Sequence, residues 1–131
     1  MKKMDYQNVK GTQDYLSNAE VVRRNIRRTL EDVFIQYGCK PLETPILNYT
    51  ELLASKYGGG AEILEEMYTL TDRGERDLAL RYDLTIPFAK VVAMNPTLRM
   101  PLNAMKLGKC FEMDQSKQGG FGNSRNVMLI L

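Results

Sequence analysis

The chain contains no histidine and no tryptophan, and it has two cysteines, Cys39 and Cys110, among its 131 residues. The absence of histidine removes the commonest general base near neutral pH and the commonest metal ligand. The two cysteines form no CxxC pair, so they supply at most half of a metal site. We therefore expect no bound metal, and we interpret both cysteines as buried, reduced thiols of a cytoplasmic protein.

Long apolar runs are also missing. The only strongly apolar run, residues 127–131, is far shorter than the roughly 20 residues that span a bilayer. The N-terminal residues 1–8 are too polar for the apolar stretch of a signal peptide. We expect no membrane segment and no export signal, and we predict that residues 127–131 form a core strand.

Strong charge of either sign is absent as well. The net charge is +2, with 44% apolar and 26% charged residues. These values are typical of a folded globular chain, and a net charge this small does not by itself indicate a nucleic-acid partner. We expect residues 1–131 to form one domain.

A long amphipathic helix is predicted over residues 18–37. Ser17 and Glu20 have the spacing of a capping box at its start, and Gly38 supplies its stop. Six apolar residues follow helical spacing and form one stripe: Val22, Ile26, Leu30, Val33, Phe34 and Tyr37.

Four arginines occupy the other side of this helix: Arg23, Arg24, Arg27 and Arg28. They could form an RNA-binding patch. However, Glu31 and Asp32 follow four residues after Arg27 and Arg28, so we favour a solvated face that pairs with itself.

The remaining pattern predicts mostly extended structure. Pro41 and Pro45 each remove a backbone donor, so the strand in residues 39–48 should lie at a boundary of the sheet or of a subunit. A short helix over 50–56, a glycine loop at 58–60 and a hairpin formed by 67–71 and 78–81 are expected next. A helix ending at Asn95 and an extended stretch over 102–111 complete an α+β fold with a mainly antiparallel sheet.

The best candidate site lies in residues 80–85, Leu-Arg-Tyr-Asp-Leu-Thr. The carboxylate of Asp83 and the hydroxyl of Thr85 could together accept hydrogen bonds from the ammonium group of a ligand. The alternative is that both residues simply cap the helix that follows. Spacing alone leaves both alternatives open.

Four ordered segments resemble the opening of histidine–tRNA ligases. They are residues 10–14 (KGTQD), 37–47, 66–74 (EMYTLTDRG) and 78–85 (LALRYDLT). The resemblance covers residues 9–102 and fades over 103–131. It implies part of a class II synthetase core, ATP-dependent attachment of histidine to its tRNA as the family activity, and histidine as a ligand of Asp83 and Thr85. It also implies a homodimer through helix 18–37 and the strand ending at Pro45.

The second family motif departs from the pattern. The family places an arginine that grips ATP, used with Mg²⁺, after the sequence matched by residues 108–111, and this chain has Glu112 there. The next loop, residues 119–124, lacks two arginines and a glutamate of the family pattern. Residues 126–131 lack polar groups that line the family's histidine pocket.

We therefore expect a truncated family member that alone neither catalyses aminoacylation nor binds ATP or tRNA. Two alternatives stay open. The chain could be a non-catalytic, histidine-binding regulatory subunit of ATP phosphoribosyltransferase in histidine biosynthesis. It could also be a folded remnant without a dedicated function.

Overall fold

The computed structural model describes residues 6–9, 12–55, 61–100, 102–114 and 121–130, with backbone alone for 61–63, 114 and 121–130. The predicted glycine loop at 58–60 lies outside the described residues. The helices are α1 (Ser17–Gln36), α2 (Thr50–Ala54), α3 (Ala61–Glu66) and α4 (Thr85–Met94). The strands are β1 (Lys40–Pro41), β2 (Leu47–Tyr49), β3 (Thr69–Thr71), β4 (Asp77–Leu80), β5 (Ala104–Asp114) and β6 (Phe121–Ile130).

The long helix α1 matches its predicted range to within one residue at each end, but its predicted cap is wrong. Leu16 occupies the N-cap position and Ser17 is already helical, with no side-chain cap. Glu20 pairs instead with Arg23, at 3.3 Å. At the other end Gly38 has φ +83°, and the amide of Cys39 donates to the carbonyl of Phe34 at 3.0 Å. This is the Schellman arrangement that glycine favours.

Two small sheets organise the strands. One has the order β1-β5-β6, with β1 parallel to β5 and β5 antiparallel to β6. The other has the order β2-β4-β3 and is antiparallel throughout. The single strand predicted over residues 39–48 is instead two short strands, β1 and β2, which belong to different sheets. Both lie at a sheet edge, as predicted, and in β1 Pro41 has no amide hydrogen to donate to a further strand.

The hairpin predicted from residues 67–81 is confirmed as β3 and β4, with the polar residues 72–76 forming its turn. The Asp72 carboxylate accepts from the amides of Gly74 and Arg76, at 2.8 and 3.1 Å, and pairs with the Arg76 guanidinium. The hydrogen bonds from Arg76 lower the pKa of Asp72. Helix α3 was not predicted.

The core lies between the second sheet, α2 and α4. Leu53, Met67, Ala79 and Ile86 are buried together. Tyr82 packs against this cluster and donates its hydroxyl to the carbonyl of Leu53, at 3.0 Å. The loop that carries Asp83 connects β4 to α4. Because both of these elements contribute residues to the core, the core holds the two ends of the loop in place.

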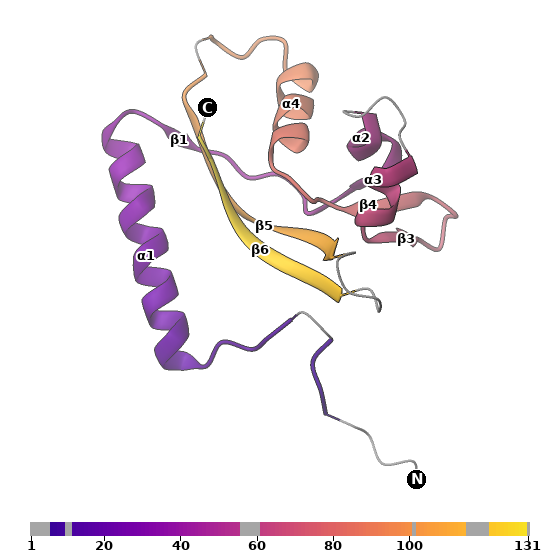
Figure 1. The fold of residues 1–131 in the computed structure, drawn as a ribbon. Coiled ribbons are helices and arrows are strands. Elements are labelled where there is room, and N and C mark those ends of the chain that lie inside the picture. Colours follow the sequence, from indigo (N-terminus) through magenta and orange to yellow (C-terminus); the bar gives the residue numbers. More distant parts are fainter. Residues whose placement is uncertain (1–5, 10–11, 56–60, 101, 115–120, 131) are drawn as a thin grey trace.

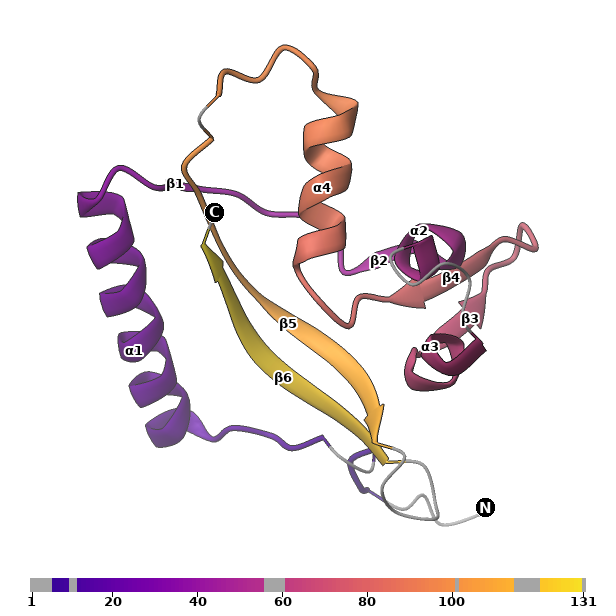
Figure 2. The same ribbon diagram turned by 45° about the horizontal axis from the view of Figure 1, so that its top comes forward.

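The β5–β6 hairpin lies between α1 on one side and α4 with the second sheet on the other (Figures 1 and 2). One face of this hairpin is therefore on the side of α1, and the other is on the side of α4 and the second sheet. The result is the predicted α+β architecture, in which the end of β4 and the middle of β5 approach each other.

Candidate functional site

Arg81 joins three parts of the chain at the end of β4. Its exposed fraction is 2%, which makes it one of the largest fully buried side chains among the described residues. Nε donates to the carbonyl of Lys109 on β5 at 2.8 Å, and Nη1 donates to the carbonyl of Thr44 at 2.9 Å. The carboxylate of Glu43 lies 3.5 Å from Nη1.

The backbone of Arg81 makes the same connection. Its amide donates to the carbonyl of Ile46, and its carbonyl accepts from the amide of Phe111, both at 2.9 Å. Residue 81 is thus attached to the segment before β2 and to β5 through both main chain and side chain. Sequence reasoning included Arg81 in the candidate segment but gave it no role.

Asp83 and Thr85 follow this anchored residue. Asp83 is half-buried, and its Oδ1 accepts from the amide of Ile86 at 3.3 Å. Thr85 is exposed and is the first residue of α4; Leu84 is the N-cap, and no side-chain cap is formed there. The prediction that Thr85 caps the helix is therefore wrong, whereas the Asp83 side chain does hold an amide of the first turn.

Cys110 lies on the same face of β5 as Gly108 and Glu112, because side chains alternate along a strand. It is buried, while Cys39 is only partly so, which corrects the expectation of two buried thiols. Burial raises the pKa of the Cys110 thiol; Asp83 and Glu112 act in the same direction, while Arg81 opposes them. The carboxylates of Asp83 and Glu112 therefore both contribute negative charge to the surroundings of Cys110.

Lys106, four residues before Cys110 on β5, is a residue that sequence reasoning missed. Its exposed fraction is 2%, and its Nζ has no hydrogen-bond partner among the described residues. Burial lowers the pKa of Lys106 to about 8, assisted by Arg81 and opposed by Glu43. The sequence feature that could have indicated a buried lysine is its position between the apolar residues Met105 and Leu107 near the start of this strand.

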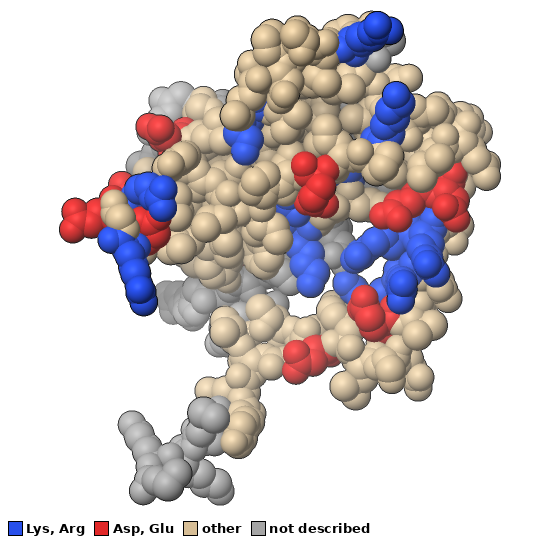
Figure 3. All heavy atoms as spheres, turned by 180° about the vertical axis from the view of Figure 1, so that it is seen from behind, with Lys and Arg blue, Asp and Glu red and all other residues tan. Residues whose placement is uncertain are grey.

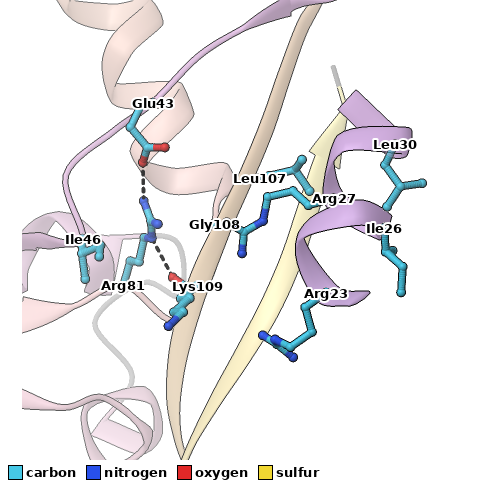
Figure 4. Close-up of a pocket in the computed structure, with 10 residues that line it drawn as sticks. All are labelled: Arg23, Ile26, Arg27, Leu30, Glu43, Ile46, Arg81, Leu107, Gly108 and Lys109. Carbon is cyan, nitrogen blue, oxygen red and sulfur yellow. Dashed lines mark hydrogen bonds and ion pairs between the residues drawn. The ribbon is translucent and has the colours of Figure 1, made fainter. Parts of the chain in front are cut away.

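A cavity of about 510 Å³ lies between α1 and β5, and Arg81 forms part of its wall. Figure 4 shows Arg81 directed toward Glu43 and Lys109, with Arg23 and Arg27 projecting from α1 on the opposite wall. Two of the four helix arginines thus line a cavity. Arg27 is nevertheless exposed, as predicted for a solvated face, whereas Arg23 is only partly exposed and pairs with Glu20 of the same helix. Neither Asp83 nor Thr85 lines this cavity.

Charges of both signs mix on the surface around α1. In Figure 3 blue and red spheres lie together on the side of the molecule where α1 is found. The expected Arg27–Glu31 and Arg28–Asp32 pairs are not among the ion pairs of the described residues of this helix.

Within the described residues, no group of three His, Cys, Asp or Glu side chains is placed to hold a metal ion. In the same part of the chain, no helix combines the length and the apolarity needed to cross a membrane.

Comparison with known proteins decides the family. The family model for histidyl-tRNA synthetase matches residues 11–128. The chain belongs to the histidyl-tRNA synthetase family. A histidine–tRNA ligase 2 of Shouchella clausii is 69% identical over 121 residues, which is 92% of this chain and 28% of that protein. The chain thus spans little more than a quarter of the length of this relative.

Solved structures of the family share the fold. The histidyl-tRNA synthetase of Nostoc sp. PCC 7120 superposes with a TM-score of 0.79 at 23% identity, covering 96% of this chain and 28% of that one. A Bacillus halodurans protein, described as an ATP phosphoribosyltransferase regulatory subunit/histidyl-tRNA synthetase, gives 0.72 at 24% identity, covering 92% and 31%. The predicted fold, part of a class II synthetase core, is confirmed at this level.

Proposed function

We propose that this chain supplies the amino-group end of a histidine pocket in a histidine–tRNA ligase fold, and that by itself it does not complete aminoacylation. The family activity is the ATP-dependent attachment of histidine to its tRNA. The observation that carries the proposal is the position of Asp83, a half-buried carboxylate beside the exposed Thr85 at the start of α4. A carboxylate and a hydroxyl at this spacing suit an α-ammonium group.

The same face fits the phosphates of ATP poorly. Burial raises the pKa of Cys110, and the carboxylates of Asp83 and Glu112 act in the same direction, so both place negative charge on this face, and negative charge repels phosphates. Where the family has an arginine, Glu112 offers an acceptor and no donor. The residues present do not fit ATP with Mg²⁺, and we assign no step to that cofactor on this chain.

The partner that we propose is a second copy of the chain. Val22 and Ile26 on α1 are 58% and 57% exposed, and β1 lies at a sheet edge. Apolar side chains on a helix beside an open edge are stabilised when a symmetry-related copy covers them. We propose a cytoplasmic single-domain chain, residues 1–131, that forms a homodimer without tRNA and outside any membrane.

Calorimetry with the purified chain tests the histidine pocket. We expect L-histidine to bind more tightly than 3-(imidazol-4-yl)propionate, which lacks the α-amino group. Asp83→Asn should reduce this preference by about tenfold, because it removes a charge-assisted hydrogen bond. Asp77→Asn, an exposed acid on β4, is the matched control. Equal binding of both ligands by the unaltered chain would refute the pocket.

Catalysis is tested separately. We expect histidine-dependent ATP–pyrophosphate exchange at background level, because stabilisation of the developing charge requires the missing cationic groups together. Exchange well above background would contradict the assignment of Glu112.

A second function uses the same pocket. The Bacillus halodurans neighbour carries the name of an ATP phosphoribosyltransferase regulatory subunit beside that of a synthetase. A chain that recognises histidine without ATP suits such a sensing role. Co-purification with a phosphoribosyltransferase in a histidine-dependent manner would favour this function over the ligase-derived one.

A further inference from the structure

The Arg81 guanidinium lies so close to Gly108 that it occupies the space a side chain at position 108 would need. A Cβ at position 108 would lie 2.5 Å from Nη2 of Arg81 and 3.1 Å from its Cζ. The same Cβ would lie 3.2 Å from Cδ2 of Leu84. Gly108 is therefore glycine because the guanidinium and Leu84 both press on the strand there.

This contact determines where the loop between β4 and α4 sits. Arg81 at its start and the buried Leu84 near its end are both held against β5 at Gly108. Asp83 lies between these two fixed points. The carboxylate has therefore little freedom to shift relative to β5 as long as both contacts are in place.

The guanidinium is suited to this task in a way that an ammonium group is not. Nε and Nη1 donate in two directions, to Lys109 on β5 and to Thr44 before β2. The planar fork of arginine satisfies both carbonyls from one side chain, whereas the point charge of a lysine does not. Glu43, the nearby acid, is 74% exposed and lies at 3.5 Å, so the carbonyls supply much of the compensation for the buried charge.

We propose that Arg81 is a positioning residue for the amino-group pocket, and that Gly108 is the complement it requires. Through its contacts with β5 it sets the place of Asp83 and Thr85, which would bind the α-ammonium group of an amino acid. This inference rests on the proposed histidine pocket, but it makes a claim about the loop that is measurable without ligand.

The ligand-free measurement is amide hydrogen exchange of the whole chain. Arg81→Lys should raise the exchange rates of the Phe111 and Ile86 amides, which are bonded to Arg81 and Asp83, by about tenfold relative to the rest of the core. Arg73→Lys, an exposed arginine in the β3–β4 turn, should leave these rates unchanged. A parallel rise at all core amides would show general destabilisation and overturn the inference.

The ligand measurement separates positioning from folding. Arg81→Lys should lower the preference for L-histidine over 3-(imidazol-4-yl)propionate by about tenfold, as expected for one misaligned hydrogen bond to a charged group. A loss of affinity that is equal for both ligands contradicts a positioning role. If the unaltered chain binds neither ligand, the proposed function fails, and the exchange rates alone decide about Arg81.

A double-mutant cycle tests the complementarity. Gly108→Ala should be strongly disruptive in the unaltered chain and much less so in the Arg81→Lys variant, because the slimmer side chain leaves room for the Cβ. Additive effects of the two substitutions on exchange at Phe111 would refute the claim that Gly108 serves Arg81.

Discussion

At the scale of single residues, Lys106 near the start of β5 is in an unusual electrostatic environment. Lys106 is buried without a hydrogen-bond partner among the described residues, and it has Arg81 and Glu43 in its electrostatic surroundings. A buried ammonium group in this situation opposes folding, because its hydration is lost and incompletely replaced.

The pH dependence of stability follows from this residue. Burial lowers the pKa of Lys106 from 10.5 in the unfolded chain to about 8 in the folded one. Between these values the unfolded chain binds more protons, so the free energy of unfolding should rise as the pH increases from 8 toward 10.5. Urea titrations across this range measure the rise.

Lys106→Met should remove that rise and increase the free energy of unfolding at pH 7 by about 1–3 kcal/mol, the usual cost of an unsatisfied buried group. Lys109→Met, at an exposed position of the same strand, serves as the control and should leave the pH profile in place. A destabilised Lys106→Met variant would mean that the ammonium group is well compensated in the folded chain.

At the scale of elements, the C-terminus of α1 is a local structure that the sequence alone specifies. Gly38 has φ +83°, and no atom outside its chain neighbours lies within 4 Å of a Cβ built on it. Gly38→Ala should therefore lower the free energy of unfolding by about 1 kcal/mol through backbone strain alone. Gly38→Asn should cost less, since asparagine tolerates the left-handed region. Equal losses for both variants in thermal unfolding would contradict this explanation.

Elements governed by local chemistry were predictable, and those governed by distant contacts were not. Gly38 ends the helix α1 because it accepts a positive φ, and the Asp72 side chain shapes the turn of the hairpin. Pro41 marks a sheet edge because it has no amide hydrogen. The orientation of α1 depends on what it packs against, so the arginines that line the cavity could not be deduced from helical spacing. The segment of residues 80–85 was found from its residue types. The role of Arg81 within it depends on Thr44 and on β5, which lie far from it in sequence.

At the scale of the whole molecule, the two sides of α1 differ from those of the usual amphipathic helix. Arg23 and Arg27 line the cavity toward the sheet. Val22 lines a separate groove, and Ile26 and Leu30 border both hollows. Four of the six residues of the apolar stripe, Val22, Ile26, Val33 and Tyr37, are 41–80% exposed, which is the arrangement expected of a surface that a second copy covers.

Sedimentation measurements test this arrangement. We expect a dimer whose dissociation constant rises by about a hundredfold in Ile26→Glu, because two isoleucine side chains lose their burial at roughly 1.5 kcal/mol or more each. Gln36→Glu places the same charge at the exposed end of α1 and should leave the dimer intact. A monomer at all concentrations of the unaltered chain would rule out the proposed interface.

The close contact between Arg81 and Gly108 also constrains how such a chain can change over generations. A side chain cannot be gained at position 108 while the guanidinium occupies that space. A side chain at position 108 should therefore be accepted more readily once residue 81 has been shortened than before. The geometry thus favours one order of substitution at this pair of positions, with residue 81 changing first.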